Sequence, residues 1–370
     1  MPAPSPLRNL HAQAEAEFAP HPPAGSVYAA GADAAEVVAT FGDLNAERAA
    51  VESGAGLLDR AERACVTVTG ADRLDLLDRL LTQTLRDLPP GRWAPAFLLN
   101  RQGRIVADLR VIALEGRVLI ETHAVVAGAA GAAIEAGVFL DDVTVEPPDA
   151  GEPLAGLSLV GPGAARAYEA ATGGDAPPGE RHARRVRVAD ADTVALLDES
   201  LGAGALTLLA PAGALHDVYE RLLETPGVRA IGWRAADEAR VRARAPMHLI
   251  DFGAASLPHE TGVLRDRVSF SKGCYPGQEI VARMESRGRA KQVLVALRAD
   301  GAETLEVGAP IRRTDQSDAE AVGVVTSSAP AREDRPAEAL AVVRTAHATV
   351  GARLDAGPAV TVAHVLGAEA

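Results

Sequence analysis

The order of apolar runs and glycine turns repeats within the first 280 residues of the chain. In the first cycle, Ala64–Thr69 alternates apolar and polar residues and ends at Gly70, which predicts a strand followed by a turn. Leucines at helical spacing then predict a helix over Ala71–Leu81. Glycine turns separate the three strands expected next, at Trp93–Leu99, Ile105–Ile112 and Val118–Thr122.

A second, similar cycle begins after Pro147-Pro148 and Gly151. A strand at Leu157–Val160 leads through Gly161-Pro162-Gly163 into a helix expected over Ala164–Ala171. Short strands are expected at 186–188, 193–197 and 206–209, and further helices at 125–139, 215–224 and 235–244. Two related cycles of strands and helices predict an α+β fold with two lobes.

After Lys291 the character of the sequence changes. Short apolar runs are spaced by Gly, Pro and Asp without a helical period, which predicts a small β-barrel. Ahead of the first lobe, Pro20, Pro22 and Pro23 break any helix. We therefore expect a flexible, partly ordered lead-in over 1–40, a first lobe over 41–150, a second lobe over 151–287 and a barrel over 288–370, with the lobes interleaved in the sequence.

The composition disfavours several classes of protein. A formal net charge of -13 and a pI of about 5.2 disfavour direct nucleic-acid binding, because an acidic surface repels phosphates. Two widely separated cysteines, Cys65 and Cys274, supply neither a disulfide framework nor the ligands of a metal site or an iron–sulfur cluster. We see no secretory signal and no apolar run long enough for a membrane span, and expect a cytoplasmic protein without membrane partners. One basic cluster is expected to form a solvated loop: Arg181, Arg184, Arg185 and Arg187.

Two turns suggest a ligand but do not establish one. The turn at Gly161-Pro162-Gly163 lies between a strand and a helix, but Arg166 stands where a dinucleotide-binding motif has its third glycine. The Asn100–Arg104 turn is followed by Asp108 within an apolar strand. Asp108 either needs a buried partner or faces solvent by alternation, and both interpretations stay open.

The segment Lys272–Glu279, KGCYPGQE, is called the signature loop below. It follows the strand-like pair Ser269-Phe270 and precedes a helical pattern over Gln278–Met284. Cys274 is then expected in a tight turn just before a helix N-terminus and near Lys272, where the helix dipole and the ammonium group favour the thiolate. A buried structural cysteine is the alternative, and the residues alone leave it open.

The signature loop resembles the K-G-C-aromatic-x-G-Q-E pattern of the YgfZ-type family, within the glycine-cleavage T-protein-like (GcvT-like) superfamily. Its flanks, Val268-Ser269-Phe270 and Ile280–Arg283, agree, and the resemblance extends over roughly 45–295. It implies a three-domain ring, two related α/β lobes plus a C-terminal β-barrel, that binds tetrahydrofolate or a derivative in a central channel. It also implies work with iron–sulfur client or assembly proteins and an essential signature cysteine.

The same resemblance assigns the site residues. Cys274 is expected to be the functional thiol, assisted by Lys272. The rest of the signature loop site comprises Gly273, Tyr275, Gly277, Gln278 and Glu279. The folate is expected to contact Asn100, Asp108 and Arg240, and no metal is expected.

Two departures bear on the branch of the superfamily. In the aminomethyltransferase branch two adjacent aspartates follow the Asn100 turn, whereas here Ala107 precedes Asp108. The G-x-x-G-E-x-G-type loop is also missing near Glu199–Leu208, where Gly202-Ala203-Gly204 stands instead. We therefore favour a folate-binding accessory protein for assembly, maintenance or repair of iron–sulfur enzymes. An aminomethyltransferase of glycine cleavage and a folate-dependent role in tRNA modification are the alternatives, and whether the protein turns over a substrate stays open.

Overall fold

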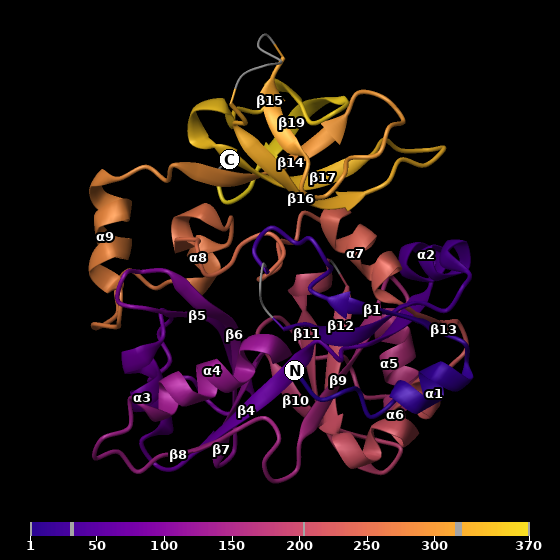
Figure 1. Ribbon diagram of the computed structural model, residues 1–370. Coiled ribbons are helices and arrows are strands. Elements are labelled where there is room, and N and C mark those ends of the chain that lie inside the picture. The colour runs from indigo at the N-terminus through magenta and orange to yellow at the C-terminus, as the bar shows by residue number, and fades with distance from the viewer. Residues whose placement is uncertain (1, 30–32, 203, 315–319, 369–370) are drawn as a thin grey trace.

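The computed structural model describes residues 2–29, 33–202, 204–314 and 320–368. Figure 1 shows a β-barrel formed by the C-terminal part of the chain, lying over two β-sheets that stand side by side, with helices packed around them. Two α/β lobes and a closed six-stranded barrel confirm the predicted α+β class and the expected two lobes with a C-terminal barrel. Among the described residues, no helix has the length and apolar character needed to cross a membrane.

The first sheet has the strand order β5-β6-β7-β4-β8 and is antiparallel. Along β6, Ala107, Leu109 and Val111 point into an apolar core because side chains alternate between the two faces of a strand. The small residues of α4 allow a close approach, and a Cβ on Gly131 would lie 3.4 Å from Val66. The elements are β4 (Arg63–Thr69), α3 (Arg73–Leu80), β5 (Arg92–Leu99), β6 (Ile105–Leu114), β7 (Arg117–His123), α4 (Ala124–Glu135) and β8 (Thr144–Glu146).

The second sheet has the order β10-β11-β12-β9-β3-β13. Its strand β3 comes from before the first sheet, so segments on both sides of residue 150 share this sheet. Helix α6 buries Leu215, Val218 and Leu222 against it, as the amphipathic pattern predicts. The elements are β3 (Ala55–Asp59), β9 (Leu154–Val160), α5 (Ala164–Thr172), β10 (Ala183–Val188), β11 (Ala191–Asp198), η1 (Glu199–Leu201), β12 (Ala205–Pro211), η2 (Ala212–Ala214), α6 (Leu215–Leu223) and β13 (Val228–Ile231).

The barrel closes in the order β14-β17-β16-β15-β18-β19. It joins the lobes through α7, whose Arg240 is fully buried and donates to Asp251 at 2.7 Å and to Ser327 of the barrel at 2.7 Å. The elements are α7 (Trp233–Arg242), η3 (Pro258–Glu260), α8 (Leu264–Arg267), α9 (Gln278–Arg287), β14 (Gln292–Ala299), β15 (Pro310–Arg313), β16 (Gly323–Ala329), β17 (Glu338–Arg344), η4 (Thr345–His347), β18 (Arg353–Asp355) and β19 (Ala359–Val365).

Some local predictions were wrong. The expected lead-in contains regular structure, and Leu7 at its beginning is fully buried in the second lobe's core. Ser269-Phe270 is not a strand. Short or pattern-poor elements were missed, since they are held by tertiary pairing rather than by local periodicity. The elements not yet named are α1 (Arg8–Gln13), β1 (Glu17–His21), β2 (Ala35–Thr40) and α2 (Leu44–Ser53).

Candidate functional site

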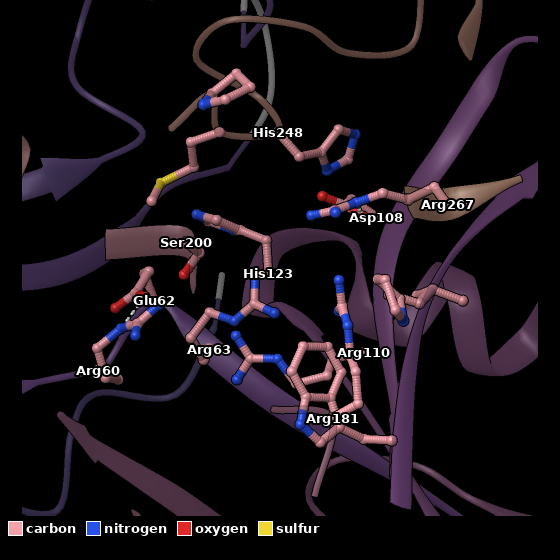
Figure 2. Close-up of a pocket in the computed structure, with 15 residues that line it drawn as sticks. Arg60, Glu62, Arg63, Asp108, Arg110, His123, Arg181, Ser200, His248 and Arg267 are labelled. Atoms are coloured by element: carbon pink, nitrogen blue, oxygen red, sulfur yellow. Dashed lines mark hydrogen bonds and ion pairs between the residues drawn. The ribbon is translucent and has the colours of Figure 1, made fainter. Parts of the chain in front are cut away.

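A pocket lies where the chain crosses from one sheet to the other, between the end of β3 and the start of β4. We call it the central pocket. Strand β6 contributes Asp108 and Arg110, which share the face opposite the core residues Ala107 and Leu109. Asp108 therefore faces the pocket rather than open solvent. Figure 2 labels the charged and polar residues that line it: Arg60, Glu62, Arg63, Asp108, Arg110, His123, Arg181, Ser200, His248 and Arg267.

Buried ion pairs hold the guanidinium groups in place at one end of the pocket. Arg60 donates to Glu62 at 2.7 Å and to Asp198 at 2.6 Å, and both partners are buried. Arg110 donates to the other oxygen of Asp198 at 2.6 Å and pairs with Glu121 at 2.7 Å. Burial alone would raise the pKa of Asp198, but Arg110 and Arg60 outweigh burial and hold that pKa well below its ordinary value. Ion pairs and hydrogen bonds of this kind restrict the side chains of the network.

An indole ring lies between two of the cationic groups. The guanidinium carbon of Arg181 lies 4.3 Å from the ring centroid of Trp93, and that of Arg110 lies 5.2 Å from it. Cation–π attraction stabilises this arrangement. The indole ring and the guanidinium groups thus pack together as one wall of the pocket.

Two neutral histidines form a chain at the side of the pocket. Nδ1 of His123 accepts from the backbone N–H of Val125 at 3.2 Å, and Nε2 of His123 lies 3.0 Å from Nδ1 of His21. Burial lowers the pKa of both rings well below the ordinary value, helped by nearby arginines. A neutral His123 whose Nδ1 accepts must carry its proton on Nε2, so it donates to His21. Both ring nitrogens of His123 are therefore occupied.

His248 differs from His123. Its side chain is buried, with 4% exposed, and neither ring nitrogen has a hydrogen-bond partner among the described residues. Burial lowers the pKa of His248 to about 4, against the attraction of Asp108. Asp108 itself pairs with Arg267 at 3.2 Å.

These groups fit the tetrahydrofolate that the family resemblance implies. The uncharged groups of the lining that lack hydrogen-bond partners among the described residues, Nε1 of Trp93 and both ring nitrogens of His248, can bond the polar edge of a ring. When bound, a folate supplies one-carbon chemistry. The chain's own residues would bind and orient it and exclude water. Within the described ranges, no group of three or more His, Cys, Asp or Glu side chains is arranged to hold a metal.

The signature loop is attached to the first lobe by Lys272. The side chain of Lys272 is 1% exposed, and its ammonium group donates to the carbonyl oxygens of Asp78, Leu81 and Gln83, the last two at 2.8 Å. An ammonium group has three donors, so these three carbonyls take all of them. In the structure Lys272 anchors the loop to the C-terminal end of α3.

Close backbone contacts hold the other end of the loop. Gly277 has φ +82°, and a Cβ there would lie 2.6 Å from the carbonyl oxygen of Asn100 and 2.9 Å from Cα of Gly103. Only glycine fits this position without strain. The side chain of Asn100 is used within its own turn, accepting from the N–H groups of Gln102 and Arg104 at 3.0 Å. The signature loop and the Asn100 turn, far apart in sequence, therefore pack together.

The two cysteines have opposite environments. Cys274 is exposed, whereas Cys65 is buried in β4 and burial raises the pKa of its thiol. Tyr275 is buried, and burial raises its pKa to about 12. Gly273 and Glu279 are exposed, and Gln278 is half-buried with only a long contact, 3.5 Å, to the carbonyl oxygen of Gly273.

The three residues expected to contact a folate do not lie together. Asp108 lines the central pocket, Asn100 forms the turn beneath the signature loop, and Arg240 lies in the buried junction between α7 and the barrel. Of the pocket's remaining charged residues, the sequence interpretation named Arg181, which it expected in a solvated loop, whereas Arg181 lines the pocket. The one local signal was Arg110, a charge in a strand otherwise rich in Val, Ile and Leu. The other side chains come from separate strands, helices and turns that meet only in the folded chain.

Two α/β lobes, a closed barrel and a charged pocket between the sheets define the class of this protein. Residues 21–272 match the family described as the GCVT N-terminal domain. Because this match covers more than half of the chain, the chain belongs to that family.

Individual relatives carry two different names. An aminomethyltransferase from Synechococcus sp. (strain CC9311) is 27% identical over 329 residues, covering 86% of this chain and 88% of the relative. The tRNA-modifying protein YgfZ from Yersinia enterocolitica is 29% identical over 241 residues, covering 64% of this chain and 69% of the relative. The crystal structure of glycine cleavage system aminomethyltransferase T from Bartonella henselae has the same fold, with a TM-score of 0.82 at 22% identity, covering 99% of this chain and 98% of that one.

The two sequence departures can be located in the structure. Ala107 is fully buried in the first lobe's core, so the position before Asp108 points away from the central pocket. Gly202 lines a different pocket, between α2 and α7, and Ala203 lies outside the described residues.

Proposed function

We propose that this chain is a tetrahydrofolate-binding accessory protein that serves iron–sulfur enzymes through the thiol of Cys274. The central pocket would hold the folate. Cys274 would act on, or dock, an iron–sulfur client or assembly protein, with Lys272 positioning the loop. Two cysteines without a disulfide framework support a cytoplasmic location.

One observation carries this proposal. Cys274 is exposed on a loop that Lys272 fixes to the first lobe, and it is not among the described residues that line the central pocket. A thiol in that position faces outward, where another protein can reach it. Burying the Lys272 ammonium group to hold the loop carries a desolvation penalty. Such a penalty is consistent with a loop whose position is needed for function.

An aminomethyltransferase is the second candidate. It is supported by the Synechococcus relative, whose match covers 86% of this chain. The departure at Ala107 does not decide against it, because that position faces the first lobe's core rather than the central pocket. A role in tRNA modification is supported by the name of the Yersinia relative, and the net charge of -13 favours an indirect role over direct RNA binding.

The test is a gene deletion complemented with wild type, Cys274→Ala or Cys65→Ala. We expect reduced activity of several iron–sulfur enzymes in the deletion strain, restored by wild type and by Cys65→Ala but not by Cys274→Ala. Full restoration by Cys274→Ala would exclude a functional thiol. Normal iron–sulfur activities with impaired glycine breakdown would favour the aminomethyltransferase.

A further inference from the structure

His248 lies on a short, constrained turn between α7 and the barrel junction. The N–H of Asp251 donates to the carbonyl oxygen of Met247 at 2.8 Å, and the Asp251 carboxylate accepts from the N–H of Met247 at 2.9 Å. The same carboxylate receives the Arg240 guanidinium at 2.7 Å. The Phe252 ring lies 5.6 Å from the His248 ring. The imidazole is therefore held in place by its own turn.

The backbone beside His248 is strained. Leu249 has φ +70°, a conformation that a branched non-glycine residue rarely adopts. Its N–H donates to the carbonyl oxygen of Phe252 at 2.7 Å, which fixes the turn in this shape. Strain of this kind persists only where surrounding contacts hold the backbone in the unfavourable conformation. It occurs most often at functional sites.

Leaving both nitrogens of a buried imidazole without partners is unfavourable. Burial makes the ring neutral, so it offers one donor and one acceptor. His123, the other histidine of the pocket, has both nitrogens occupied by Val125 and His21. Of the pocket's two described histidines, His248 is the one able to bond a ligand.

The charged groups around His248 include both signs. Asp108 pairs with Arg267 at 3.2 Å. The charge of Asp108 raises the pKa of His248, whereas the charge of Arg63 lowers it. Figure 2 shows His248 near Asp108 and Arg267, while Arg60, Arg110 and Arg181 lie toward the other end of the pocket. At that other end Arg60 and Arg110 are already ion-paired, whereas the uncharged ring of His248 has no hydrogen-bond partner among the described residues.

From this geometry we propose that His248 directly recognises the uncharged ring system of the bound ligand, with one ring nitrogen donating to it and the other accepting from it. This inference rests on the proposed folate-binding function and names the residue that forms hydrogen bonds with the polar edge of the pteridine.

The test measures binding of 5-formyltetrahydrofolate by calorimetry to wild type, His248→Leu and His248→Asn. His248→Leu removes both hydrogen-bonding groups and should weaken binding about 10- to 100-fold, since each buried bond contributes about one power of ten. His248→Asn keeps one donor and one acceptor and should stay within roughly tenfold of wild type. The control is His259→Leu, because His259 is another poorly exposed histidine but lies outside the central pocket and pairs with Glu285 at 3.5 Å. Its affinity should match wild type.

A second measurement detects the contact itself. In 15N-labelled full-length protein, the two ring nitrogens of His248 should show a neutral imidazole at pH 7 and should both shift when 5-formyltetrahydrofolate is added. The resonances are assigned by their loss in His248→Asn. Wild-type affinity in folded His248→Leu, or unshifted His248 nitrogens at saturation, would overturn the inference and leave folate binding intact. Failure of the wild type to bind would overturn the proposed function, and this inference with it.

Discussion

Replacing Lys272 with methionine removes the ammonium group that ties the signature loop to the first lobe, while keeping a side chain of similar length. The ammonium donates to three carbonyl oxygens, of Asp78, Leu81 and Gln83, and lies 3.4 Å from the Asp78 carboxylate. These partners span the C-terminal end of α3 and the turn after it. The substitution therefore removes every side-chain hydrogen bond that Lys272 makes to the first lobe.

The size of the effect follows from those contacts. A hydrogen bond to a charged group contributes about 1.5–3 kcal/mol, so three contribute about 5–9 kcal/mol before opposing effects. Burial opposes this, and it lowers the pKa of Lys272 below the ordinary value despite the nearby Asp78. Breaking one side of a buried charged contact costs about 3–5 kcal/mol in measured cases. We expect Lys272→Met to lower the free energy of unfolding by about 3–5 kcal/mol.

Urea unfolding followed by circular dichroism measures this change. The sequence contains two lysines, so Lys291→Met, which changes an exposed side chain, is the matched control and should shift stability by less than about 0.5 kcal/mol. Limited proteolysis of the native variants should cut Lys272→Met within the signature loop and spare Lys291→Met. A loss of less than about 1 kcal/mol for Lys272→Met, with an unchanged proteolysis pattern, would refute the anchoring role.

Three further predictions concern the loop, the buried ion pairs and the thiols. Gly277→Ala should destabilise the protein by about 1–3 kcal/mol in the same urea assay, because φ is +82° and the new Cβ would overlap the Asn100 carbonyl oxygen; wild-type stability would contradict the close packing seen there. The pKa of Asp198 lies below its ordinary value, so the ionised Asp198 stabilises the fold fully above a pH of about 4, and this stabilisation is lost as the pH falls further. The difference in free energy of unfolding between wild type and Asp198→Asn should therefore shrink below that pH. A difference that stays constant down to pH 2 would argue against this role of Asp198. An aromatic disulfide reagent should label Cys274 rapidly in the native protein and Cys65 only after unfolding, and equal labelling rates would contradict their different burial.

Much of the fold was predictable from local patterns. Strands such as β6 are apolar runs bounded by glycine turns, and helices such as α6 have a clear period in their apolar residues, which are the residues buried in the structure. Strand β3 was missed because all five of its residues are buried, so no alternation marks it. Its placement between β9 and β13 depends on long-range pairing that no local window contains.

The site was predictable only in part. The signature loop was found because its residues are consecutive, and the exposure of Cys274 agrees with an accessible thiol. Lys272 was expected to assist the thiol, whereas the structure places its ammonium among backbone carbonyls of α3, a contact 189 to 194 residues away in sequence. The central pocket was largely missed, because Arg60, Arg181 and His248 come from separate turns and have no common spacing.

The most direct measurement of folate binding in the central pocket uses tryptophan fluorescence. The chain has two tryptophans, and Trp93 lines the pocket between Arg110 and Arg181. In Trp233→Phe protein, Trp93 is the single reporter. Titration with 5-formyltetrahydrofolate should quench its emission in a saturable way, and Trp93→Phe protein should show a much smaller change. A folded Trp233→Phe protein whose emission shows no saturable change at millimolar ligand would contradict folate binding in this pocket.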